Sequence, residues 1–129
     1  MPRRKRAEQF LAMARKDFTA LQAMTDPVVF SVEVFGFHAQ QTAEKCLKAW
    51  IELLDVDAPI THNIIVLLAI LEEQETDVTL WWELVDLNSF AVQFRYEQYD
   101  ETIEDLDRLS IIARLKSLLE QVEGRMSQE

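Results

Sequence analysis

The chain has 129 residues, of which 49% are hydrophobic and 28% are charged, a balance typical of a globular protein rather than a disordered one. Its formal net charge is −10, yet residues 1–16 carry six basic groups against one acid, while the remainder carries seven against 22. So acidic a body repels a phosphate backbone unless its few cations are gathered in one place, which argues against generic nucleic-acid binding.

The backbone composition favours long helices with short connections, because only two glycines and three prolines are present. The single cysteine, Cys46, excludes an intramolecular disulfide and a cysteine-built zinc site, and it fits a reducing cytosol. The longest apolar run, residues 64–71, is too short to span a bilayer, and the basic start of the chain is interrupted too soon to be a signal peptide. We therefore expect a cytoplasmic protein without a membrane segment.

Hydrophobic spacing predicts an all-α fold, an up-and-down antiparallel bundle of about five helices in one domain over residues 1–129. The basic tip at residues 1–6 and the tail at 124–129 are expected to fray. The first helix covers residues 4–24 and ends before Pro27, because proline disfavours helical geometry in the residue before it. The second begins between residues 27 and 33 and reaches residue 54.

The third helix is predicted for residues 62–73 with Thr61 as its N-cap. It is apolar almost all round, which suits the middle of a bundle or the cover of a partner subunit. The fourth covers residues 78–95, and its neighbours Trp81 and Trp82 cannot both face the same core.

The fifth helix, residues 101–122, carries two apolar rows on different sides. Either the helix is distorted near Ser110, or its two halves face different surfaces, of which a homodimer contact is one. The first row contains Ile103, Leu106, Leu109 and Ala113, and the second row contains Ile111, Leu115, Leu118 and Val122.

Motifs that carry chemistry by themselves are missing from the sequence. It has no phosphate loop, dinucleotide fingerprint or nucleophile elbow. Two histidines, His38 and His62, are too few for a metal centre, so neither a metal nor a cofactor is expected. Cys46 lies on an apolar stripe and is predicted to be an inert core thiol.

Three segments together resemble the HEPN family. Residues 37–49, Phe-His-Ala-Gln-Gln-Thr-Ala-Glu-Lys-Cys-Leu-Lys-Ala, are similar to its second-helix signature, with Thr42 where alanine is usual. Thr61-His62 is similar to the opening of the family's next helix. Leu87-Asn88 followed by Arg95-Tyr96 is similar to the end of its fourth helix, with Glu97 in place of the proline. The three matches follow one another in the order and at the spacing found in the family, and this implies the HEPN helical fold.

The resemblance implies two kinds of activity. Many HEPN proteins are ribonucleases with an Arg-x(4–6)-His motif, which supplies a cation for the phosphate and an acid or base near neutral pH. Counted from Arg95, the positions for that histidine hold Asp100, Glu101 and Thr102, and no histidine follows His62. Because the histidine of the ribonuclease motif is missing, the resemblance favours a HEPN protein that is not an enzyme.

The other kind is a small stand-alone HEPN protein paired with a minimal nucleotidyltransferase, as in a toxin–antitoxin-like pair. The resemblance then implies a homodimer that binds a nucleotide or the partner enzyme. A divergent ribonuclease toxin, in which Arg95 acts with Tyr96 or Tyr99, and a purely structural interaction protein remain as alternatives. The candidate contacts are Arg95, Tyr96, Lys45, Gln41, His38 and His62.

Each candidate also has a purely structural explanation. Arg95 is favoured at a helix C-terminus by the helix dipole alone, and Tyr96 would pack over the bundle end. Lys45 would pair with Glu44 or with a carboxylate such as Asp86, and His62 would cap or pack a helix N-terminus.

Overall fold

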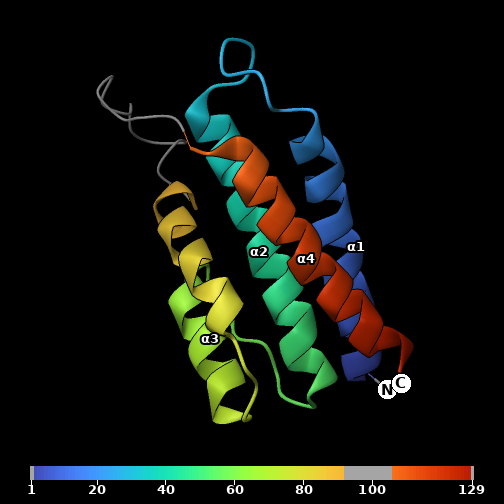
Figure 1. The fold of residues 1–129 in the computed structure, drawn as a ribbon. Coiled ribbons are helices and arrows are strands. Elements are labelled where there is room, and N and C mark those ends of the chain that lie inside the picture. The colour runs from blue at the N-terminus through green and yellow to red at the C-terminus, as the bar shows by residue number, and fades with distance from the viewer. Residues whose placement is uncertain (1, 92–105, 129) are drawn as a thin grey trace.

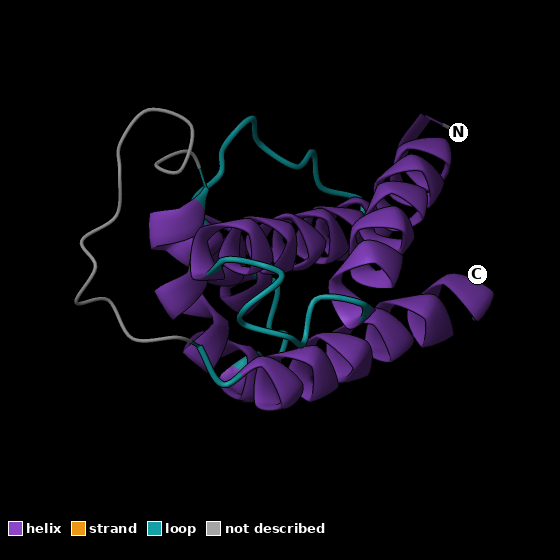
Figure 2. Cartoon of the chain, turned by 90° about the horizontal axis from the view of Figure 1, so that it is seen from above, coloured by secondary structure: helices purple, strands orange, loops and turns teal. Residues whose placement is uncertain are grey.

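The computed structural model describes residues 2–91 and 106–128, and all regular structure in these residues is helical (Figures 1 and 2). The prediction of an all-α helical bundle is thereby confirmed. Its elements in chain order are α1 (Pro2–Gln22), α2 (Val32–Leu53), α3 (Ile64–Glu73), the 3₁₀ helix η1 (Thr79–Phe90) and α4 (Arg108–Ser127).

Helix α2 is the centre of the bundle, because it packs against each of the other four elements. Figure 1 shows α1 and α4 beside it on one side and α3 with η1 on the other. The two chain ends lie close together, and Arg4 donates to the carbonyl oxygen of Met126 at 3.2 Å. Residues 2–6, expected to be a frayed tip, form the first turn of α1, where Arg3 pairs with Asp55 and Asp57.

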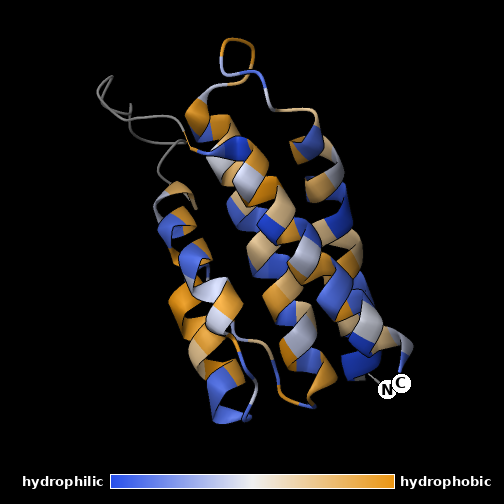
Figure 3. Ribbon diagram, viewed as in Figure 1, coloured by the Kyte–Doolittle hydropathy of each residue, from blue (hydrophilic) through white to orange (hydrophobic). Residues whose placement is uncertain are grey.

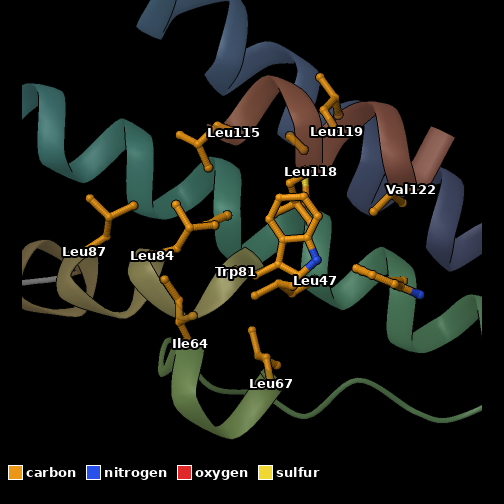
Figure 4. Packing of buried hydrophobic residues seen from close by; sticks show 14 of the residues in the cluster. Leu47, Ile64, Leu67, Trp81, Leu84, Leu87, Leu115, Leu118, Leu119 and Val122 are labelled. Carbon is orange, nitrogen blue, oxygen red and sulfur yellow. The ribbon is translucent and has the colours of Figure 1, made fainter. Parts of the chain in front are cut away.

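The core collects one apolar face from each element. Hydrophobic and hydrophilic residues alternate around the helices, as amphipathic helices require (Figure 3). Figure 4 shows side chains of α4, η1, α3 and α2 gathered in this core, in which η1 packs against both α4 and α3. The labelled side chains are Leu115, Leu118, Leu119 and Val122 of α4, Trp81, Leu84 and Leu87 of η1, Ile64 and Leu67 of α3, and Leu47 of α2.

Element η1 differs from the α-helix expected over residues 78–95. It is a 3₁₀ helix from Thr79 to Phe90, and residues 92–105 lie outside the described part of the chain. In a 3₁₀ helix the side chains at every third position lie in one row. The sequence places four large apolar residues at that spacing, and all four are buried: Trp81, Leu84, Leu87 and Phe90. Of the adjacent tryptophans, Trp81 is 4% and Trp82 38% exposed, so the prediction that they face differently is confirmed.

The start of α3 corrects a second expectation. The helix begins at Ile64 rather than at His62, and its N-cap is Asn63, not Thr61. Asn63 Oδ1 accepts from the amide of Ile65 at 2.9 Å, whereas Thr61 Oγ1 accepts from the amide of Asn63 at 3.1 Å. Both side chains suit a cap, and the position where the chain turns decides between them.

Helix α4 begins at Arg108, later than residue 101, which lies outside the described residues. Its buried row contains Leu115, Leu118 and Val122, while Leu109 is 71% exposed. Of the first predicted row, Leu109 and Ala113 are exposed, whereas Leu106 packs against the core and Ile103 lies outside the described residues. No helix among the described residues has the length and the apolar character needed to cross a membrane.

Candidate functional site

A carboxylate without solvent exposure lies in the middle of α2. Glu44 Oε2 accepts from Lys45 Nζ at 2.9 Å and from Lys48 Nζ at 3.0 Å. Its other oxygen, Oε1, accepts from Gln40 Nε2 at 3.1 Å and lies 2.9 Å from His62 Nδ1. The helical spacing of 40, 44 and 48 places three of these groups on one side of α2.

The Glu44 carboxyl group stays ionised. Burial alone would raise its pKa, but the hydrogen bonds from Lys45, His62, Lys48 and Gln40 outweigh burial and lower the pKa to about 2. At neutral pH the carboxylate can only accept, so Nδ1 of His62 must carry a proton.

The loop before α3 brings His62 to this carboxylate. Gln40 Nε2 also donates to the backbone carbonyl of His62 at 3.0 Å, so one turn of α2 holds both the main chain and the ring. The His62 side chain is 58% exposed, and no described residue bonds to its Nε2. The ring therefore offers Nε2 to a ligand, in an orientation fixed by Glu44.

His62 borders an open hollow of about 360 Å³ at the junction of α3 and η1. Asn88, near the end of η1, accepts from the amide of Ile64 at 2.8 Å and donates to Asn63 Oδ1 at 2.8 Å. These bonds fix the antiparallel arrangement of α3 and η1 and satisfy the first amides of α3. The lining residues are Thr61, His62, Asn63, Asn88 and Ala91.

Comparison with protein families identifies the chain. The family model described as the HEPN domain matches residues 3–125. The chain belongs to the HEPN family. No curated protein and no solved structure gives a significant match.

The HEPN sequence signature now has a structural meaning. Its Gln-Gln-x-x-Glu-Lys segment supplies Gln40, Glu44 and Lys45, and its Thr-His pair supplies the ring that Glu44 holds. The two segments are far apart in the sequence and form one polar cluster. The Arg-Tyr segment, residues 95 and 96, lies outside the described residues.

The structure brings three of the predicted HEPN site residues together. Lys45 Nζ lies 3.3 Å from Gln41 Oε1 and contacts Glu44, which also holds His62. His38 is elsewhere, with Nδ1 3.1 Å from Asp17 Oδ1 of α1. Arg95 and Tyr96, the remaining candidates, cannot be placed relative to this cluster because they lie outside the described part of the chain.

Sequence reasoning named Glu44 only as a partner of Lys45, a pair that the structure contains, and missed both the burial of Glu44 and the part played by Lys48. Glu44 and Lys48 are acidic and basic residues one helical turn apart, a pattern that usually marks a solvated face. The signal for burial was the apolar residues on either side of Glu44, Ala43 and Cys46, both without solvent exposure. Asn88 carried no such signal, because only the fold brings it to the start of α3. Among the described residues, no group of three His, Cys, Asp or Glu side chains is placed to hold a metal ion.

Proposed function

We propose that this HEPN protein is a non-catalytic module that binds a nucleotide and a minimal nucleotidyltransferase partner, in a toxin–antitoxin-like pair in the cytoplasm. The observation that carries the proposal is the exposed His62 ring, held by buried Glu44 at the edge of a polar hollow. In a ring that carries its proton on Nδ1, Nε2 accepts a hydrogen bond, and the amino groups of bases and the hydroxyl groups of ribose are donors that fit it.

The local charge supports an anionic ligand. Two ammonium groups, Lys45 and Lys48, contact one carboxylate, Glu44, and leave one positive charge uncompensated in the cluster. The rest of the chain is strongly acidic, so this cluster is a place where its cations are gathered. Such a local excess is the condition under which an acidic protein attracts phosphate.

The hollow supports a ligand of nucleotide type rather than a simple ion. Its walls offer the side chains of Thr61 and Asn63 beside the His62 ring, which are neutral donors and acceptors. Such groups recognise the edges of a base or a sugar, while charge serves the phosphates.

Isothermal calorimetry with ATP, GTP, CTP and UTP tests the nucleotide half of the proposal. We expect heat with at least one nucleotide and its loss in His62→Ala and in Arg95→Ala. His38→Ala is the matched control, because that ring is paired with Asp17 and does not line the hollow. No heat with any nucleotide would refute nucleotide binding. Co-purification with a minimal nucleotidyltransferase encoded in the neighbouring gene tests the partner half separately.

The homodimer is part of the same proposal. Ile65 and Val66 of α3 are 44% and 40% exposed, an apolar surface that a second copy would cover. Light scattering should give a mass of twice 15.1 kDa, and a monomer at micromolar concentration would contradict the dimer.

One observation also favours a second candidate, a divergent ribonuclease. A histidine whose proton is fixed by a carboxylate is suited to general acid–base chemistry, although here it comes from the loop before α3 and not from a position after Arg95. Incubation with tRNA decides between the two. Cleavage that is lost in both Arg95→Ala and His62→Ala would favour the enzyme, and intact tRNA would favour the binding module.

A further inference from the structure

A second cavity lies away from the His62 hollow and shares no residue with it. It occupies about 210 Å³ between the C-terminal parts of α2 and α4 and the start of η1. Its lining combines three apolar side chains with three polar ones. These residues are Trp50, Leu80, Trp81, Asp77, Gln121 and Arg125.

Trp50 lines this cavity, and its indole carries a buried donor without a partner in the described part of the chain. The residue is 1% exposed, and its Nε1–H finds no acceptor among the described residues. A buried tryptophan N–H usually has a partner. Because Trp50 lines the cavity, the resonance of this N–H reports on a ligand that binds there.

Arg125 supplies a cation next to that donor. Its guanidinium carbon lies 4.8 Å from the centre of the Trp50 ring. With the Gln121 amide turned so that its oxygen faces Arg125, that oxygen accepts from Nε at 3.1 Å. No carboxylate of the described residues pairs with Arg125. Other arginines of the described chain do form ion pairs with carboxylates, namely Arg3, Arg4, Arg6, Arg15 and Arg114.

Asp77 supplies the opposite charge to the same cavity. Its Oδ1 accepts from Thr79 Oγ1 at 2.7 Å and from the Thr79 amide at 3.0 Å, while Oδ2 has no donor among the described residues. The bonds from the Thr79 side chain and backbone lower the pKa of Asp77, so the carboxylate is charged at neutral pH. Asp77 and Arg125 therefore line one cavity as opposite charges without pairing with each other.

We propose that this cavity binds a neutral α-amino acid with an apolar side chain. The ligand carboxylate meets Arg125 beside the Trp50 ring, the ammonium group meets Asp77, and the side chain lies against Leu80 and Trp81. The cavity thus matches a zwitterion, whereas a simple anion would leave Asp77 unpaired and face its repulsion. This inference is independent of nucleotide binding at His62.

Titration of the ¹⁵N-labelled protein with leucine tests the proposal through the indole N–H resonances. We expect a saturable shift of the Trp50 signal, which Trp50→Phe identifies by its disappearance. The exposed Trp82, assigned with Trp82→Phe, should not move, since it does not line the cavity.

Ligand and protein variants separate the two charged contacts. Arg125→Gln should weaken leucine binding about tenfold, the loss of one charge-assisted contact. Asp77→Asn should weaken leucine similarly but strengthen the binding of 4-methylpentanoate, which lacks the ammonium group and is repelled by the Asp77 carboxylate. Arg114→Gln, whose partner is Glu83 outside this cavity, serves as the control of matched charge. Circular dichroism melting confirms that each variant is folded.

Three results would overturn the proposal: no shift of the Trp50 signal with leucine, equal binding of leucine and 4-methylpentanoate, or binding of inorganic phosphate in place of leucine. The last two would identify a plain anion site.

Discussion

His62 Nδ1 lies 2.9 Å from Oε1 of Glu44, 18 positions earlier in the chain, and this contact joins the loop before α3 to the middle of α2. The Gln40 side chain strengthens the junction by donating to the His62 carbonyl oxygen at 3.0 Å. One buried carboxylate therefore positions the exposed ring of the candidate site and is the counter-charge that two lysines share. Site geometry and stability depend on the same group.

Glu44→Gln should lower the free energy of unfolding at pH 7 by about 3 kcal/mol or more, because it leaves Lys45 and Lys48 largely buried without their counter-charge. Urea denaturation measures the loss. The isosteric amide retains packing, so a change well below 1 kcal/mol would show that the cluster does not hold its ions as described.

The same carboxylate predicts a dependence of stability on acid. Its pKa is about 2 in the folded protein against an ordinary 4.5, so its contribution is fully present above about pH 4.5 and is lost as pH falls towards 2. The loss is on the order of 3 kcal/mol. Urea titrations between pH 6 and 2.5 should show a steeper decline in the wild type than in Glu44→Gln. Glu120→Gln, on an exposed position of α4, should decline like the wild type.

Gly36→Ala should destabilise the protein by about 1–3 kcal/mol, because a Cβ at this position of α2 would overlap the Phe90 ring of η1. The control is the other glycine. Gly124→Ala, in α4, meets nothing within 4 Å and should stabilise the helix by about 0.5–1 kcal/mol. Thermal melts of the two variants should therefore shift in opposite directions, and two shifts of the same sign would contradict the close approach of α2 and η1.

Leu118→Ala should cost about 2–5 kcal/mol, because the residue is fully buried in the core and its removal leaves a cavity. Leu109→Ala, at an exposed position of the same helix, should change stability by less than about 0.5 kcal/mol in the monomer. A large cost for Leu109→Ala that grows with protein concentration would instead identify the surface around Leu109 as a subunit contact.

Cys46 should resist thiol reagents in the folded protein. The residue has no solvent exposure, and its burial raises the pKa of the thiol, with Glu123 adding to the rise. Ellman's reagent at pH 8 should react with native protein only at the rate of unfolding, and at once in urea. Fast stoichiometric labelling without denaturant would show that α2 opens locally.

The fold was largely predictable because helical periodicity is a local property. The stripes of apolar residues predicted most of the ends of α2 and α3 to within about two residues, which is the usual uncertainty in where a helix begins or ends. The spacing of three from Trp81 to Phe90 was present in the sequence too, but it is also compatible with one face of an α-helix. In the structure this row forms one side of a 3₁₀ helix and packs against the core, where Phe90 lies close to Gly36.

The candidate site was predictable only in part. Lys45, Gln41 and His62 were candidates from the family resemblance, and the structure joins them through Glu44, which had looked like a surface residue. His38 was a candidate with them, yet its ring lies against Asp17 of α1 and apart from the cluster.

The sequence by itself determined the helical class, the family and the missing histidine after Arg95, because these depend on residue type and spacing along the chain. Only the tertiary structure decided which charges are buried, which histidine is held by a carboxylate, and that Trp50 and Arg125 share a cavity with Asp77. The physical reason is that the ionisation of a side chain and its readiness to bind depend on its neighbours in space.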